Sequence, residues 1–176
     1  MRVDVGELLK ASTGETRTYR FEDWELEEEA GGDPARVSGV ATLLRTRAGI
    51  LASVHLSLRA RQPCSRCLKE VDIPLELDFE EEFLPTVDLL TGASLPSPGD
   101  SGVFLIDARQ VLDLSEAARQ YRETALPMQP LCRPDCAGLC PTCGRDLNLK
   151  ACACPREPVD SRWSAFAELG RHMQDP

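Results

Sequence analysis

Eight cysteines constrain this chain more strongly than any other feature of its sequence. Six lie within residues 132–154, in the run LCRPDCAGLCPTCGRDLNLKACAC, and Cys64 and Cys67 form a separate C-x-x-C motif upstream. Thiolates at such short spacings can converge on one tetrahedral metal ion, and zinc is the usual occupant of an all-sulfur site. A bound metal folds segments that cannot bury an apolar core of their own, so we expect a zinc-organised region near the C-terminus.

The rest of the sequence indicates a cytoplasmic location. No apolar run reaches the length of a membrane span, and the first residues, MRVDVGELLKAS, lack the charged start, long apolar stretch and cleavage site of a signal peptide. Thiols remain reduced in the cytoplasm, so disulfides do not explain eight cysteines. We therefore expect metal-bound thiolates and no membrane partner.

Several ligand sets are compatible with the spacing. The candidate zinc ligands are Cys132, Cys136, Cys140, Cys143, Cys152 and Cys154, with Cys64 and Cys67 as further candidates. The knuckle Cys140-Pro-Thr-Cys143-Gly144 could close a site with Cys152 and Cys154, which would leave Cys132 and Cys136 spare or free to join Cys64 and Cys67. Pairing the two C-x-x-C knuckles with each other is also reasonable. The sequence predicts at least one zinc ion and leaves the ligand set open.

Residues 37–83 have the alternation typical of strands with one buried face. Apolar side chains occupy the even positions from Ile50 to Ala60, and polar ones occupy most of the odd positions. Residues 71–80 alternate in the same way. We expect residues 37–46 to pair with residues 50–61 through a three-residue turn that sets Leu44 opposite Ala52, with Gly49 in the left-handed conformation. A two-residue turn would instead place Arg45 on the buried face.

The remaining segments predict an α+β fold. We expect a short helix or turn over residues 5–10, strands over 16–24 and 103–106, and a helix that begins with a capping box between Asp113 and Glu116. A last helix near Asp160 would present Trp163 and Phe166 to the core. The predicted architecture is an antiparallel meander with packed helices, with residues 1–126 as the core domain and residues 127–176 as a cysteine-rich zinc segment packed on it.

The charge distribution suggests where the chain could contact nucleic acid. A net charge of −9 argues against a general polyanion binder, but residues 34–69 contain seven basic residues and no acidic one. The candidate RNA-binding residues are those around the upstream cysteines: Arg59, Arg61, Arg66 and Lys69. The alternative is cross-strand pairing of Arg59 and Arg61 with Asp72 and Glu76.

The sequence does not indicate an enzyme. It contains neither a phosphate-cradling glycine motif nor a local nucleophile signature with a histidine partner. All-cysteine zinc sites are usually closed and structural. We therefore expect no catalytic residues and no small-molecule substrate.

Several motifs, taken in order, carry a resemblance to a known family. They are Pro63-Cys64-Ser65-Arg66-Cys67-Leu68, Leu112-Asp113-Leu114, Leu126-Pro127-Met128, Leu131-Cys132, Cys136-Ala-Gly-Leu-Cys140-Pro-Thr-Cys143-Gly144, Leu147-Asn148, Cys152-Ala-Cys154 and Asp160-Ser-Arg162-Trp163. The chain resembles the YceD family of large ribosomal RNA subunit accumulation proteins. The resemblance implies a cytoplasmic, non-enzymatic factor that supports ribosomal RNA accumulation and large-subunit assembly through contact with precursor RNA.

Two other functions remain compatible with the residues. The acidic residues between Glu76 and Glu82 could dock a basic large-subunit ribosomal protein, which would make the chain an adaptor. A zinc–thiolate redox sensor is the third hypothesis, although the Cys64 motif lacks the strand-to-helix setting of thioredoxin-like sites.

Overall fold

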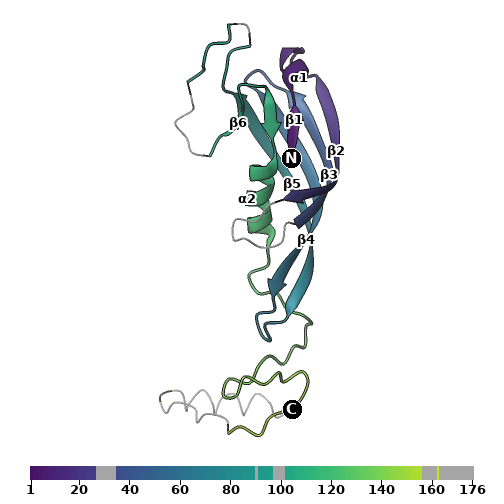
Figure 1. Cartoon of the computed structure of the whole chain (residues 1–176), viewed down its shortest axis with the longest axis vertical. Helices are drawn as coiled ribbons and strands as arrows, with labels where there is room; N and C mark the ends of the chain where they lie inside the picture. Colours follow the sequence, from purple (N-terminus) through teal and green to yellow (C-terminus); the bar gives the residue numbers. More distant parts are fainter. Residues whose placement is uncertain (27–34, 90, 97–101, 156–161, 163–176) are drawn as a thin grey trace.

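A curled seven-stranded sheet forms the body of the molecule in the computed structural model, which describes residues 1–26, 35–89, 91–96, 102–155 and 162 (Figure 1). The strands are β1 (Arg2–Asp4), β2 (Thr16–Leu26), β3 (Ala35–Arg45), β4 (Ile50–Pro63), β5 (Glu70–Pro85), β6 (Phe104–Ile106) and β7 (Val111–Asp113). Their order across the sheet is β1-β7-β6-β5-β4-β3-β2. Helix α1 spans Gly6–Lys10 and helix α2 spans Ser115–Ala125.

The expected antiparallel meander with packed helices does not describe this fold. Consecutive strands from β2 to β5 pair antiparallel, but β6 runs parallel to β5, and β7 and β1 extend the sheet beyond it. The described residues contain only two helices, and one of them has 5 residues. The structure is therefore mostly β, a curled half-barrel, where the sequence predicted an α+β class. The predicted C-terminal helix with Trp163 and Phe166 lies outside the described residues.

The alternation read from the sequence sets the buried face of the long strands. All even positions from Ile50 to Ala60 are buried, and Leu75, Leu77 and Phe79 of β5 line the same face. Helix α2 lies over this face (Figure 1). There Tyr121 stacks on Phe79 with ring centroids 4.5 Å apart. At about 25 cal/mol per Å² of buried apolar surface, this shared core is the main source of stability for the body.

The β3–β4 turn differs from both turns considered in the sequence. Leu43, not Leu44, lies opposite Ala52, and Arg45 pairs with Ile50. The connection has four residues because Thr46 closes it: its N–H donates to the Gly49 carbonyl (3.1 Å) and its hydroxyl accepts from the Gly49 N–H (2.9 Å). Gly49 is not left-handed. A Cβ at this position would instead collide with the Phe83 carbonyl, so close strand approach is what requires glycine.

The capping box is also only half formed. Asp113 accepts a hydrogen bond from the Ser115 N–H (2.9 Å), as a capping residue would. Glu116 does not reach back, because its carboxylate accepts from Arg119 (2.7 Å) and Gln120 (2.8 Å) within α2.

Strands β4 and β5 extend beyond the body. Pairing of β3 with β4 ends at Val37 and Leu58, whereas β4 and β5 remain paired as far as Pro63 and Glu70. Residues 59–63 and 70–74 therefore form a two-stranded ribbon, here called the stalk. The stalk leads to the cysteine-rich end of the molecule, residues 64–69 and 130–155, here called the knob (Figure 1). The division of the chain into domains at residue 126 stays a prediction.

Candidate metal centre

The eight cysteines gather into two groups of four within the knob. Site I contains Cys64, Cys67, Cys132 and Cys136, and site II contains Cys140, Cys143, Cys152 and Cys154. Within each group all sulfur atoms lie within 4.8 Å of one another. This is the first of the two partitions that the sequence left open, with all eight cysteines used.

The spacing of the sulfur atoms suits a tetrahedral ion. In site I the Sγ atoms of Cys64 and Cys136 are 3.9 Å apart, and those of Cys67 and Cys132 are 3.6 Å apart. A tetrahedron with zinc–sulfur bonds of 2.3 Å has edges of about 3.8 Å. The donor set and the distances therefore fit zinc, with four thiolates at each site and no position open for a substrate.

Both sites are built on the same turn. In site I the Cys64 N–H donates to the Lys69 carbonyl (2.8 Å) and the Leu68 N–H donates to the Cys64 carbonyl (2.9 Å). In site II the Cys140 N–H donates to the Arg145 carbonyl (2.8 Å) and the Gly144 N–H donates to the Cys140 carbonyl (2.9 Å). This turn needs a left-handed residue after its second cysteine, and the φ angles are 60° at Leu68 and 69° at Gly144.

Hydrogen bonds make some of these thiols easy to ionise. Backbone N–H groups of Cys67 and Arg66 lower the pKa of Cys64 to about 6. The same kind of donation, first from Cys143, lowers the pKa of Cys140 to about 6. These two cysteines therefore supply thiolates at neutral pH, as metal binding requires.

Other thiols in the same clusters resist ionisation. Interaction with Cys136, together with burial, raises the pKa of Cys132 to about 12, and interaction with Cys143 does the same for Cys154. Four thiolates crowded together repel one another, so complete ionisation of either cluster calls for a cation among the sulfur atoms. A divalent ion would supply that charge.

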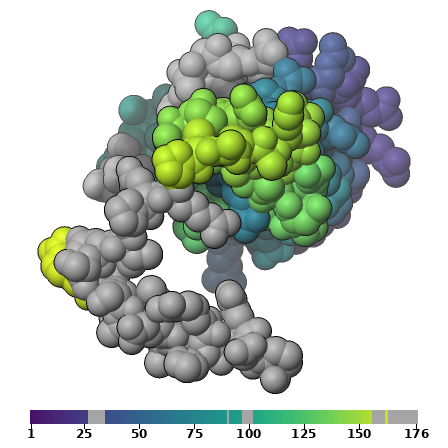
Figure 2. Space-filling model, turned by 90° about the horizontal axis from the view of Figure 1, so that it is seen from below, coloured from purple at the N-terminus to yellow at the C-terminus, as the bar shows by residue number. Residues whose placement is uncertain are grey.

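The two sites differ in how they are connected to the rest of the chain. Site I joins the tip of the β4–β5 hairpin to residues 132 and 136, whereas all four ligands of site II lie within residues 140–154. Cys64, Cys67 and Cys136 are buried, and Val71, Leu131 and Leu139 pack around them. In site II only Cys140 is buried. Figure 2 shows the cysteine-rich segment, in green to yellow, spread across the end of the molecule.

The four candidate RNA-binding residues lie along the stalk and at its tip. Arg59 and Arg61 are on the exposed face of β4, where Arg61 pairs with Asp72 (3.3 Å). Arg66 donates to the Cys136 carbonyl (2.8 Å), and Lys69 pairs with Asp146 (2.7 Å). Two of the four thus also help to hold the knob together, and their contact with RNA stays a prediction.

Sequence reasoning missed the support that surrounds site I. The side chain of Asn148 donates to the Cys136 sulfur (3.4 Å), and Asp146 connects Asn148 to Lys69. Both residues stand in the loop between the two cysteine pairs of site II. The sequence did hold a signal for this support: an amide and a carboxylate side chain in a cysteine-rich loop, because such side chains commonly orient metal ligands.

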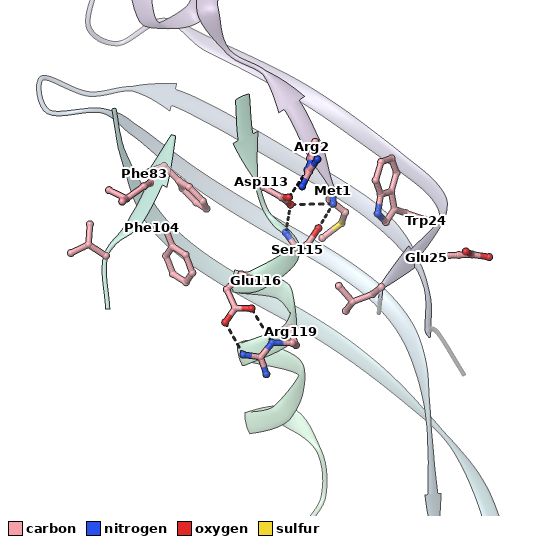
Figure 3. A pocket seen from close by; sticks show the side chains of 13 residues that line it. Met1, Arg2, Trp24, Glu25, Phe83, Phe104, Asp113, Ser115, Glu116 and Arg119 are labelled. Atoms are coloured by element: carbon pink, nitrogen blue, oxygen red, sulfur yellow. Dashed lines mark hydrogen bonds and ion pairs between the residues drawn. The ribbon is translucent and has the colours of Figure 1, made fainter. Parts of the chain in front are cut away.

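A separate hollow of about 880 Å³ lies in the body, between β1, β2, β6 and α2 (Figure 3). Four of its charged side chains form two pairs: Arg2 with Asp113 (2.8 Å) and Arg119 with Glu116 (2.7 Å). Hydrogen bonds from Arg119 and Gln120 lower the pKa of Glu116 to about 2. The Arg2–Asp113 pair ties β1 to β7 and the Arg119–Glu116 pair lies within α2, so both have a structural role.

One family model matches most of this chain. The family described as Large ribosomal RNA subunit accumulation protein YceD matches residues 52–170. An uncharacterized protein of Mycobacterium tuberculosis H37Rv is 29% identical over 121 residues, which cover 69% of this chain and 56% of the relative. An uncharacterized protein of Mycobacterium leprae is 24% identical over 106 residues, covering 60% and 46%.

A further relative has a descriptive name. The chloroplastic large ribosomal RNA subunit accumulation protein YCED homolog 1 of Arabidopsis thaliana is 30% identical over 63 residues, or 36% of this chain and 20% of that protein. The chain spans about half the length of the mycobacterial relatives it matches. No solved structure gives a significant match. In the described part of the chain, none of the helices has the length and apolar character needed to cross a membrane. Since the family match takes in well over half of its residues, the chain belongs to the YceD family.

Proposed function

We propose that this protein supports the accumulation of ribosomal RNA of the large subunit, as a non-enzymatic assembly factor in the cytoplasm. Family membership is the observation that carries this proposal. Depletion of the protein should lower the ratio of large-subunit to small-subunit ribosomal RNA, and a plasmid-borne copy should restore it. An unchanged ratio in fully depleted cells would rule the proposal out.

We further propose that both four-cysteine sites hold zinc with a structural role. The support is the donor chemistry and the sulfur spacing at both sites. Zinc would neutralise the crowded thiolates, and Cys64 and Cys140 would be its first partners because their pKa values lie lowest. Metal analysis of the purified chain should give two zinc ions per molecule, and a metal-free chain with an ordered knob would exclude this role.

Direct contact with ribosomal RNA is proposed for the stalk. The knob contains five basic side chains, Arg66, Lys69, Arg133, Arg145 and Lys150, against the carboxylates Asp135 and Asp146. Two zinc–tetrathiolate centres would add about two negative charges each and leave the knob near neutral. The residues proposed to contact phosphate are the exposed stalk arginines Arg59 and Arg61, which share the ribbon with Glu70 and Asp72, with Arg66 and Lys69 next to them at the tip.

A paired substitution tests the RNA contact. Arg59→Ala with Arg61→Ala should weaken binding to large-subunit RNA and reduce its salt slope by about one unit per lost phosphate contact. Lys10→Ala with Arg109→Ala is the matched control, because it removes the same charge from exposed positions in α1 and in the β6–β7 turn. Equal salt slopes for the two double variants would show that the stalk arginines serve only surface pairing.

One observation favours a second function, docking of a basic ribosomal protein. The exposed face of β5 presents Glu76, Asp78, Glu80 and Glu82 in a row, and each accepts a 2.7 Å hydrogen bond from the strand or turn beside it. Such fixed carboxylates suit a cationic partner. Glu76→Gln, Asp78→Asn and Glu80→Gln together should abolish capture of basic large-subunit proteins if this function holds. They should leave RNA binding by the stalk unchanged.

A further inference from the structure

The loop between the two cysteine pairs of site II contacts both metal sites. Its residues Asp146 and Asn148 lie between Cys143 and Cys152 in sequence. Their side chains nevertheless reach residues of site I and of the hairpin tip. The loop is therefore shared: its backbone closes one site and its side chains support the other.

Asn148 is the central contact. Its Oδ1 accepts from the Ala137 N–H and from the Arg133 guanidinium, both at 2.8 Å. Its Nδ2 donates to the Cys136 sulfur at 3.4 Å and to Asp146 Oδ1 at 2.7 Å. An amide has two donors and an acceptor oxygen with two lone pairs, so this arrangement uses all of them. Neither a carboxylate nor an apolar side chain can reproduce it.

Asp146 extends the network to the tip of the hairpin. Its Oδ1 also accepts from the Asn148 N–H (2.9 Å), and its Oδ2 pairs with Lys69 (2.7 Å), two residues after Cys67. The ion pair with Lys69, together with the Asn148 hydrogen bonds, lowers the pKa of Asp146 to about 2. The carboxylate is therefore charged at all physiological pH values, and its pair with Lys69 links the loop to the hairpin tip beside site I.

The backbone follows the same route. The Leu139 N–H donates to the Arg66 carbonyl (3.1 Å), and the Leu147 N–H donates to the Gly138 carbonyl (2.9 Å). A Cβ on Gly138 would lie 3.0 Å from that Arg66 carbonyl, so glycine permits the close approach of the two segments. Three stretches, residues 64–69, 136–140 and 145–148, thus meet beside site I.

The loop has little apolar packing of its own and is bounded at both ends by cysteines of site II. Leu147 and Asn148 are half-buried, while the neighbouring residues 149–151 are exposed, so little apolar packing holds the loop. Its ends are attached to Cys143 and Cys152, both ligands of site II. If site II held no metal, the loop would be free to move. Placing Asn148 beside Cys136 would then cost about 1–2 kcal/mol of chain entropy for each residue that has to be ordered.

We propose that Asp146 and Asn148 couple the two metal sites, so that zinc at site II positions the loop that holds site I. The inference rests on the proposed zinc occupancy. Because coupling between binding sites is reciprocal, zinc at site I also tightens binding at site II. Asn148 is a positioning residue: it orients the Cys136 thiolate and does not itself bind metal. Removal of such a partner of a ligand typically weakens metal binding 10–100-fold.

Zinc titration of the full chain with cysteine-resolved alkylation tests the coupling. Free zinc is set with a chelator buffer, and mass spectrometry measures how far each cysteine is protected. Asn148→Ala should shift the protection of Cys64, Cys67, Cys132 and Cys136 to at least 10-fold higher free zinc. Asn148→Asp should do the same, since it keeps the shape but loses the donor to sulfur. Lys150→Ala, an exposed change in the same loop, is the matched control and should leave both curves in place.

A second variant opens site II directly. Cys143→Ser with Cys152→Ser should shift the protection of the four site I cysteines by 10-fold or more, while the sheet stays folded by circular dichroism. Unshifted site I curves in this variant and in Asn148→Ala would overturn the coupling and leave both zinc sites standing. No protection of any cysteine in the wild-type chain would instead overturn the zinc proposal, and the coupling with it.

Discussion

The body and the knob of this molecule are held together by different means. In the body, long apolar side chains such as Leu43, Leu56 and Phe83 are almost completely buried in one hydrophobic core. In the knob, the buried cluster consists of Cys64, Cys67 and Cys136, with Val71, Leu131 and Leu139 only partly covered around it. We therefore expect the body to fold from hydrophobic burial alone, whereas the knob would depend on the proposed zinc ions.

Removal of metal should separate the two regions most clearly. We expect chelation to unfold residues 130–155 while the strands of the body remain protected, because structural zinc contributes on the order of 10 kcal/mol to such segments. Hydrogen exchange with mass spectrometry measures both regions in one experiment. If exchange in β3 and β4 rises as much as in the knob, the body also depends on metal and the distinction fails.

A cavity in the body should produce the opposite result. Leu56 is fully buried in β4, so Leu56→Ala should lower the free energy of unfolding of the body by about 2–5 kcal/mol. The zinc content should not change. Ser57→Ala removes an exposed neighbour that donates to Glu76 and should cost less than about 0.5 kcal/mol. Urea unfolding with parallel metal analysis checks both; loss of zinc from Leu56→Ala would contradict the independence of the regions.

The two knuckles offer a smaller and sharper comparison within the knob. Leu68 occupies the left-handed position that glycine holds in site II, and its side chain is 64% exposed. Leu68→Gly should therefore stabilise site I by about 1 kcal/mol, because it relieves backbone strain without loss of packing.

The reverse change serves as its counterpart. A Cβ at Gly144 would meet nothing within 4 Å, so Gly144→Leu adds strain without a clash and should weaken site II by about 1–2 kcal/mol. Competition with a chromophoric chelator gives the zinc affinity of each variant. A weaker site I in Leu68→Gly would show that the leucine side chain contributes to the knob.

The smallest effect concerns His55 on the exposed face of the body. Its hydrogen bond to Asp78 (2.7 Å) and the nearby Glu76 raise its pKa above the ordinary value. The charged pair stabilises the fold fully below the pKa of the unfolded histidine, about 6.5, and this contribution disappears as pH rises through the higher folded value.

Stability measurements at pH 5.5 and 8.5 test this effect. The free energy of unfolding of wild type should exceed that of His55→Gln by more at pH 5.5 than at pH 8.5, and the zinc content of the two chains should be equal. Titration of His55 by NMR should give a lower pKa in Asp78→Asn. A difference between wild type and His55→Gln that does not change with pH would mean that the pair is only a surface contact.

The sequence predicted the long strands and the cysteine region, because both depend on local patterns. Alternation from Ile50 to Ala60 specifies which face of β4 is buried, wherever the strand lies. Strand β6 falls within the strand expected over residues 103–106. The strands β1 and β7 have 3 residues each, too few for a period to be visible. They form only because distant residues such as Val3 and Leu112 pair, which no local pattern indicates.

The sequence identified the eight cysteines as candidate metal ligands, but it could not decide which four belong to each site. Spacing shows that thiols can converge, but the partners of Cys64 and Cys67 depend on how the tail crosses the hairpin tip. That crossing follows from contacts such as the Arg66 carbonyl with the Leu139 N–H and the Lys69–Asp146 pair. The predicted register between β3 and β4 was wrong for a similar reason, because the hydrogen bonds of Thr46 determine the length of the loop between them.

The stalk has a mechanical consequence. Beyond Leu58 it has lost β3 on one side, and β6 reaches β5 only between Phe83 and Pro85, so both long edges of the ribbon are open in the described structure. Open edges invite pairing with other chains, and Pro63 and Pro74, which lack N–H groups, together with the charged side chains between them, discourage it. Five residue pairs at about 3.3 Å each separate knob from body by about 17 Å. A partner surface that touched both ends would therefore have to place its two contacts about this distance apart, at an angle that follows the right-handed twist of the ribbon.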